Sequence, residues 1–263
     1  MHSETTLSVV IPTLNEARNI EHVLGLLPDT VDEVILVDGG STDATVAIAR
    51  RARPGIRVLG QTRPGKGSAL ATGILAATGD EIVTIDADGS MDPREIERFV
   101  APLRAGAQYV RGSRFSRGGG SADITAVRFI GNKVLNSLAN LLFGTGHSDL
   151  CYGFNAMTRE AAGALRLPDP ADGTRLRHWG DGFEIETLMH VRAVKAGLRV
   201  VEVPSFEASR RFGESNLSAV RDGLRCLRTL LFERFVSASV DSVVDAERRA
   251  RPKVTAELVG EGE

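Results

Sequence analysis

The chain has 263 residues, of which 42% are hydrophobic and 25% are charged, as expected of a soluble globular protein with a sizeable core. Its formal net charge of -2 argues against a general nucleic-acid-binding protein, which would carry a basic excess. The first residues show no secretory signal pattern, and no apolar run approaches the roughly 20 residues of a membrane span. We therefore expect a cytoplasmic protein, at most resting on the inner face of a membrane. Its two cysteines, Cys151 and Cys226, fit a reducing compartment, although they could still pair.

The first part of the chain alternates between apolar runs and helix-like segments. Because β-branched residues dominate them, four runs are predicted to be strands: 7–11, 34–37, 56–59 and 81–85. The first helix is expected to open at Thr13 or Asn15, either of which could cap it. Three more helices are predicted at 44–52, 68–77 and 93–105. This alternation indicates an α/β protein with right-handed crossovers and a mostly parallel sheet flanked by helices.

Two carboxylates, Asp86 and Asp88, follow the fourth of these strands. Strand alternation would point both toward the same side, and such a pair suits Mg²⁺ or Mn²⁺ shared with the phosphates of a nucleotide. Taken alone, the pair could equally cap a turn or the next helix. Ligands of open parallel sheets bind beyond the carboxyl ends of the strands, so the segments 12–16 and 38–43 should face the same crevice. The dinucleotide and P-loop glycine motifs are both missing after the first strand.

The second part of the chain is less regular. The glycine-rich run 117–121 is expected to lack regular structure, either as a surface linker or as a mobile loop that orders over a ligand. A polar loop is expected at 168–177. The remaining elements follow from apolar patterning: strands at 109–115, near 155–157 and at 199–204, and helices at 124–143, 182–196 and 217–235.

Seven short motifs occur in order along the chain: VIPTLNE (10–16), VDGGSTD (37–43), GKG (65–67), DAD (86–88), GSRF (112–115), DLCYGF (149–154) and RFGESN (211–216). Each is weak alone, but together they are specific. From about Leu7 to Phe235 the chain resembles family 2 glycosyltransferases of the GT-A fold, and it looks closest to the polyprenyl-phosphate (dolichyl-phosphate) mannose and glucose synthases. The resemblance implies a single GT-A domain with a nucleotide-sugar-binding half (1–115) and an acceptor-binding half (116–235) that ends in an amphipathic helix. The tail (236–263) is charged and poor in aromatic residues, so it is expected to be disordered.

The resemblance also assigns the donor site. By similarity, Asp86 and Asp88 hold the metal that bridges the two phosphates, and Lys66 lies near the nucleotide. The remaining residues implied in donor binding are Pro12, Thr13, Leu14, Asn15, Glu16, Asp38 and Ala87. Arg114, Arg210 and Arg211 offer planar guanidinium groups suited to phosphate oxygens, and of these Arg114 and Arg211 are predicted to complete the site. Two positions depart from the family pattern: Gly39 stands where a second aspartate is common, and Ser90 where a glutamine often supplies a metal ligand.

The general base depends on the acceptor. A lipid phosphate is already an anion and needs little help, whereas a hydroxyl group must lose a proton. For that case the candidates are Asp149, which matches the acceptor-loop acid of the family, and Glu184, which could equally serve only to favour a helix dipole. His147 and His178 are lone loop histidines, and no metal-binding role is assigned to them.

The helices at 124–143 and 217–235 carry interrupted apolar stripes, and arginines flank the stripe of the second. Packing on the domain or on a second subunit of a homodimer is the preferred interpretation, and an interfacial membrane helix is the alternative.

Together these features predict an inverting, metal-dependent transfer of a hexose from a UDP- or GDP-sugar to a phosphorylated acceptor, with a polyprenyl phosphate preferred. Transfer to a soluble hydroxyl acceptor, a sugar nucleotidyltransferase and a non-catalytic sugar-nucleotide binder remain alternatives.

Overall fold

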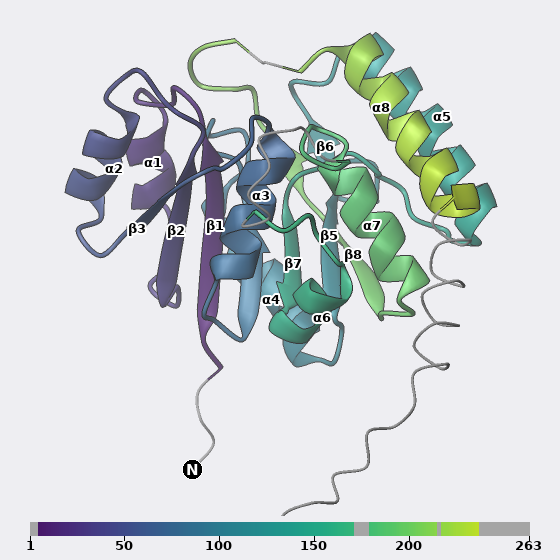
Figure 1. Cartoon of the computed structure of the whole chain (residues 1–263), viewed down its shortest axis with the longest axis horizontal. Helices are drawn as coiled ribbons and strands as arrows, with labels where there is room; N and C mark the ends of the chain where they lie inside the picture. The colour runs from purple at the N-terminus through teal and green to yellow at the C-terminus, as the bar shows by residue number, and fades with distance from the viewer. Residues whose placement is uncertain (1–4, 171–178, 215–216, 237–263) are drawn as a thin grey trace, which may run out of the picture.

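The computed structural model describes residues 5–170, 179–214 and 217–236 (Figure 1). The predictions for His178, for most of the loop at 168–177 and for the tail after residue 236 lie outside the described residues. Within the described ranges the chain forms one central sheet with helices on both faces, which confirms the predicted α/β class. The division into a donor half and an acceptor half stays a prediction, because the sheet contains strands from both halves.

The central sheet has seven strands in the order β3-β2-β1-β4-β7-β5-β8. Its strands are β1 (Leu7–Thr13), β2 (Glu33–Asp38), β3 (Arg57–Gly60), β4 (Glu81–Thr84), β5 (Tyr109–Ser113), β7 (Asn155–Thr158) and β8 (Val200–Pro204). Strand β7 runs antiparallel to both of its neighbours, β4 and β5, and the other pairs are parallel. The carboxyl ends of β1, β2, β4 and β5 therefore lie along one edge of the sheet.

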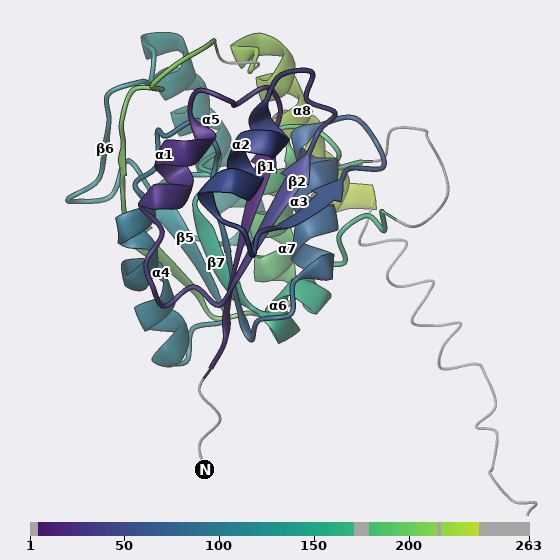
Figure 2. The same ribbon diagram turned by 90° about the vertical axis from the view of Figure 1, so that its left-hand side faces the viewer.

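Helices cover both faces of this sheet (Figure 2). One face carries α1 (Ile20–Gly25), α2 (Thr45–Ala52) and α4 (Ile96–Arg104), which follows a 3₁₀ turn at Pro93–Glu95. The other face carries α3 (Lys66–Ala76), α6 (Arg159–Ala164) and α7 (Ile185–Lys195). Helices α5 (Ala126–Phe143) and α8 (Ala219–Leu231) lie side by side outside α7 (Figure 1), and a π-helical turn at Phe232–Val236 follows α8.

The strands are buried on both faces, which explains why they read as continuous apolar runs rather than alternating ones. Val9 and Ile11 of β1 pack with α1 and α4, whereas Val10 between them packs with α3. Phe99 of α4 stacks on Phe154, with ring centroids 3.9 Å apart, and so anchors the segment that leads into β7. The helices packed on the two faces of the sheet thus hold the strand ends in fixed positions relative to one another.

The glycine-rich run was predicted wrongly to lack regular structure. Gly120 and Ser121 form strand β6, which pairs in parallel with β9 (Phe206–Glu207). The hydroxyl group of Ser121 donates a hydrogen bond to the carboxylate of Glu207. The run is therefore tied to a segment more than 80 residues away in the sequence, a contact that local sequence patterns cannot indicate.

The first helix also begins later than predicted. Neither Thr13 nor Asn15 caps it, because α1 starts at Ile20 after a loop. Asn15 has a φ angle of 57°, in the left-handed region, and its side-chain oxygen accepts a hydrogen bond from the backbone of Thr42 at 2.8 Å. The segment after β1 is thus fastened to the loop after β2. Helix α6 was not predicted, since six residues are too few to show apolar periodicity.

Candidate active site

A cavity of about 770 Å³ opens at the carboxyl ends of β1, β4 and β5. Nine of the residues predicted for the donor site line it: Pro12, Thr13, Leu14, Glu16, Lys66, Asp86, Ala87, Asp88 and Arg114. Three others, Asn15, Asp38 and Arg211, are not among its lining residues. The cavity extends between α5 and α8, where Val127, Arg128, Leu135, Arg221 and Arg225 contribute to its wall.

Asp38 and Asn15 shape the donor side from outside the cavity. The carboxylate of Asp38 accepts hydrogen bonds from the backbone of Gly40 at 3.1 Å and of Ser41 at 3.0 Å. The Ser41 hydroxyl in turn accepts one from the backbone of Asn15 at 2.9 Å. These bonds hold the loops after β1 and β2 together. Asp38 keeps its predicted importance, but as a residue that folds the loop.

Lys66 occupies the first turn of α3 and joins two parts of the site. Its ammonium nitrogen lies 2.7 Å from a carboxylate oxygen of Asp86 and 2.8 Å from one of Glu186 on α7. Burial opposes its charge, yet the two carboxylates outweigh burial and raise the pKa of Lys66. The lysine therefore stays protonated beside Asp86.

The approach of α3 to α7 depends on a close backbone contact. The backbone N–H of Gly67 donates to the carbonyl of Asp181 at 2.9 Å, and a Cβ on Gly67 would lie only 1.8 Å from the carbonyl oxygen of Gly180. Arg63 and Asp181 form a fully buried ion pair at 2.9 Å across the same junction. These contacts fix α3 against the segment that leads into α7, and so place Lys66 next to Glu186.

A second cation, Arg210, mirrors this arrangement on the other side of the carboxylate pair. Its guanidinium group lies 3.1 Å from Asp88 and also pairs with Glu16 in the loop after β1. Burial raises the pKa of Glu16, despite hydrogen bonds from Asn19 and the charge of Arg210, both of which lower it. Each carboxylate of the Asp86–Asp88 turn therefore pairs with a cation, and that cation is shared with a second carboxylate, Glu186 or Glu16.

The charge balance of this cluster suits a divalent cation. Burial raises the pKa of Asp86, and the charge of Asp88 adds to the effect although Lys66 opposes it, so the two carboxylates repel one another. Among the described residues there is no group of three or more His, Cys, Asp or Glu side chains arranged to hold a metal ion. Asp86 and Asp88 both line the open cavity, and two carboxylates fit a metal such as Mg²⁺, which commonly uses one or two carboxylates and takes its other ligands from water and phosphate.

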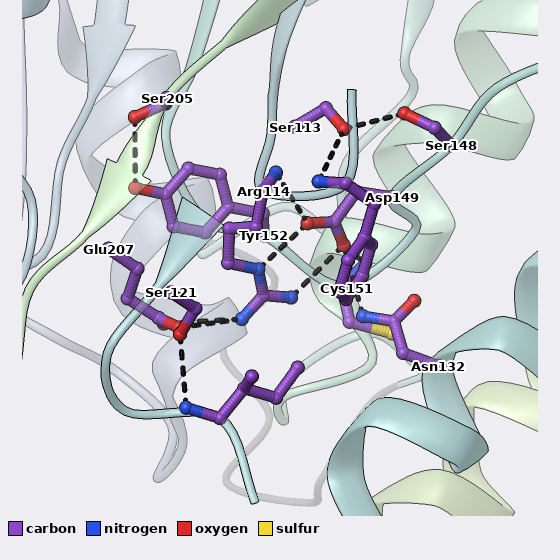
Figure 3. A network of polar contacts seen from close by, with 12 residues as sticks. Ser113, Arg114, Ser121, Asn132, Ser148, Asp149, Cys151, Tyr152, Ser205 and Glu207 are labelled. Carbon is purple, nitrogen blue, oxygen red and sulfur yellow. Dashed lines mark hydrogen bonds and ion pairs between the residues drawn. The ribbon is translucent and has the colours of Figure 1, made fainter. Parts of the chain in front are cut away.

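Arg114 is the centre of a buried polar network beside the cavity (Figure 3). Its guanidinium group binds both carboxylate oxygens of Asp149, at 2.7 and 3.0 Å, and also lies 3.1 Å from Glu207. Asn132 of α5 donates a third side-chain bond to Asp149 at 3.0 Å. The network joins β5, β9 and α5, so Arg114 has a structural role in addition to its place on the cavity wall.

The structure does not support either predicted general base. Asp149 is fully buried and does not line the cavity. Burial would raise its pKa, but the Arg114 guanidinium group holds the pKa of Asp149 below its ordinary value, which makes it a poor proton acceptor. Glu184 is buried just before α7 and likewise does not face the cavity.

Glu186 lines the cavity instead and was missed from the sequence. Residues two apart on a helix point to nearly opposite sides, so Glu184 and Glu186 cannot both face the cavity. The sequence therefore offered Glu186 as the alternative to Glu184. Arg211, predicted as a phosphate ligand, does not line the cavity; its side chain packs on the turn at Gly89 and contacts His22 at 3.3 Å. Arg210, its neighbour, is the arginine that reaches the carboxylate pair.

An α/β sheet with acidic and basic side chains gathered at its carboxyl edge is the arrangement of a nucleotide-binding enzyme. The model of the family described as "Glycosyl transferase family 2" matches residues 8–166, and the chain belongs to this family. The predicted family, the GT-A type of fold and the assignment as a glycosyltransferase are thereby confirmed.

Individual relatives agree with this assignment. The chain is 31% identical over 229 residues to glycosyltransferase AglJ of Haloferax volcanii, covering 85% of this chain and 70% of the relative. It is 32% identical over 220 residues to the polyprenol monophosphomannose synthase of Mycolicibacterium smegmatis, covering 80% of each. Among solved structures it resembles glucosyl-3-phosphoglycerate synthase from Mycobacterium tuberculosis in complex with Mn²⁺, UDP and phosphoglyceric acid, with a TM-score of 0.67, 26% identity, and coverage of 89% of this chain and 80% of the other.

Proposed function

We propose that the chain is an inverting hexosyltransferase that uses a divalent metal and moves a sugar from a UDP- or GDP-sugar to a phosphorylated acceptor, with a polyprenyl phosphate as the preferred acceptor. The observation that carries the proposal is that Asp86 and Asp88 line the same cavity as the donor-loop residues Pro12, Thr13, Leu14 and Glu16. A single displacement would invert the anomeric centre, which the coupling constant of the product's anomeric proton would report.

Asp86 and Asp88 would hold the metal, either Mg²⁺ or Mn²⁺. When bound, it would supply positive charge to the diphosphate oxygens as the sugar leaves. The chain's own cations support the same task, because Lys66 and Arg210 already lie beside these two carboxylates. The complex of the similar mycobacterial synthase with Mn²⁺ and UDP supports this assignment.

The acceptor side of the cavity combines positive charge with apolar surface. Between α5 and α8 its wall contains Arg128, Arg221 and Arg225 together with Val127 and Leu135. Asp123 and Asp222 line the same cavity and pair with Arg128 and Arg225, so the positive charge is partly neutralised. This composition suits an anionic headgroup attached to an apolar chain. A phosphate acceptor is already an anionic nucleophile, which is consistent with the burial of Asp149 and Glu184 away from the cavity.

A panel of ligands tests the donor assignment. Because a ligand that binds the native state raises the unfolding midpoint by mass action, UDP, GDP and their hexose conjugates should be compared with and without Mn²⁺. We expect one nucleotide and its sugar conjugate to raise the midpoint clearly more than the other, and to do so only with the metal. Equal midpoints for every nucleotide in the presence of Mn²⁺ would contradict the proposal.

We further propose that the α5–α8 face rests on an anionic membrane. The two helices expose several large apolar side chains: Val127, Phe129, Ile130, Val134, Leu141, Val220, Leu224 and Leu231. Leu141 of α5 is 81% exposed and Val220 of α8 is 70% exposed. On α8 the basic residues Arg221 and Arg225 lie close to Val220 in the sequence. Among the described residues, no helix is long and apolar enough to cross a membrane. Such a face, with basic residues beside the apolar ones, is typical of interfacial helices.

Vesicle flotation tests this surface contact. The protein should float with vesicles that contain phosphatidylglycerol, less so with neutral vesicles, and less at high salt, because the arginines contribute through charge. The double variant Val134→Glu/Leu224→Glu should lose flotation, whereas Leu75→Glu, which alters an exposed leucine on α3, should retain it. If the wild-type protein does not float but forms a dimer that the double variant disrupts, then a second subunit, and not a membrane, covers this face.

A further inference from the structure

The two cysteines of the chain lie together at the acceptor side of the cavity. Cys151 belongs to the segment that follows Asp149, and Cys226 lies on α8. Their thiol groups contact one another, and both residues line the cavity. Both are free thiols in this structure. The proposed transfer reaction uses neither of them.

The surroundings give the two thiols different properties. Cys151 is half-buried and open to the cavity, whereas Cys226 is only 4% exposed. The contact with Cys226 lowers the pKa of Cys151, and the charge of Arg114 also lowers it, whereas burial and the charge of Asp149 raise it. The same contact, together with burial, raises the pKa of Cys226. Cys151 is therefore the thiol that a small oxidant in the cavity can reach, and Cys226 is held beside it.

Cys151 also contacts the buried network around Arg114. Its backbone N–H donates to Asp149 at 3.3 Å, and Asp149 is the buried partner of Arg114 (Figure 3). Near Cys226, the residues Asp222 and Arg225 of α8 line the cavity and form an ion pair at 3.1 Å. A bond between the two sulfur atoms would fasten α8 to the segment that holds Arg114.

We propose that Cys151 and Cys226 form an oxidation site, in which a peroxide converts the thiol pair into a disulfide that fixes α8 across the acceptor side of the cavity. The Cys151 thiolate attacks the peroxide O–O bond and becomes a sulfenic acid, while the leaving oxygen is released as water or alcohol. The Cys226 sulfur then displaces the hydroxyl group of the sulfenic acid as water and gives up its proton. Two electrons pass from the two sulfur atoms to the peroxide, and thiols such as dithiothreitol reverse the change.

The experiment treats the full-length protein with a modest excess of hydrogen peroxide and measures the intact mass. We expect a loss of 2 Da, complete reversal by dithiothreitol, and a single tryptic species that links the peptides of Cys151 and Cys226. The oxidised protein should unfold roughly 10 °C higher, the order of shift expected for a crosslink that closes a long loop. Its turnover should fall severalfold, since α8 can no longer adjust to the acceptor.

Variants separate this account from its alternatives. Cys226→Ser should stop at a sulfenic or sulfinic acid on Cys151 and show no rise in the unfolding midpoint, and Cys151→Ser should show no change in mass. If these variants do not fold, peptide mapping of the oxidised wild-type protein decides alone. An unchanged mass, irreversible sulfinic acid on the wild-type protein, or disulfides only between two chains would overturn the proposal. Apart from the turnover, none of these results depends on the identity of the sugar donor or acceptor.

Discussion

Replacement of Asp88 by asparagine is expected to lower kcat/KM for hexose transfer by about 10³-fold or more, equivalent to about 4 kcal/mol of transition-state stabilisation. Asparagine has nearly the shape of aspartate and can still accept a hydrogen bond from Arg210, so the fold should persist. What it loses is the negative charge on which the proposed metal site depends. Initial rates at several Mn²⁺ concentrations would measure the effect.

A matched variant shows whether the loss is specific. Asp92→Asn removes the same charge four residues away, but Asp92 caps the 3₁₀ turn through the backbone of Arg94 and does not line the cavity. Its activity should stay within about twofold of wild type, as expected of a surface position outside the site. If Asp88→Asn kept more than a tenth of wild-type activity, the proposed role of this carboxylate would be refuted.

The largest expected effect on stability comes from Arg114→Met. The substitution leaves the buried carboxylate of Asp149 without its bidentate partner and also removes the contact to Glu207. Breaking one side of a buried ion pair typically costs about 3–5 kcal/mol, because the remaining charge is uncompensated. Urea unfolding followed by circular dichroism would measure the loss in the free energy of unfolding.

The control for this variant is Arg94→Met, which breaks a largely exposed pair with Asp92 at 2.7 Å. Such a pair is worth at most about 1 kcal/mol, so the two variants should differ by several-fold. If both variants lost the same free energy of unfolding, burial would not strengthen the contribution of the Arg114 network to stability.

The pH dependence of these proteins should differ as well. Since Arg114 lowers the pKa of Asp149 in the folded state, the ion pair stabilises the protein above the ordinary carboxyl pKa of about 3.9, and this contribution is lost as the pH falls through the lower folded value. The gap between wild type and Arg114→Met should therefore be full at neutral pH and narrow in acid.

Local patterns in the sequence predicted those parts of the fold that depend on short-range chemistry. The β-branched runs, the helix that begins near Lys66 and the acidic turn after β4 all lie close to where they were expected. The donor side of the site could be predicted for the same reason, because each of its segments directly follows a strand and the parallel topology brings those ends together.

The acceptor side depends on contacts between distant segments, which the sequence does not reveal. Asp149 has the residue type of a general base, but its sequence context does not show that Arg114, 35 positions earlier, pairs with its carboxylate. Arg210 reaches Asp88 across 122 positions, and Glu186 reaches Lys66 from another helix. The match to the family model ends at residue 166, before Glu186 and Arg210, so it does not bear on them.

The most direct test of the account is a crystal of the protein grown or soaked with Mn²⁺ and the nucleoside diphosphate that stabilises it most. We expect an anomalous manganese peak between the carboxylates of Asp86 and Asp88, with the diphosphate oxygens on its open side and the base held by the segment from Pro12 to Glu16. Nucleotide bound in the cavity with no manganese at that position, and with Asp86 and Asp88 still paired to Lys66 and Arg210, would contradict it.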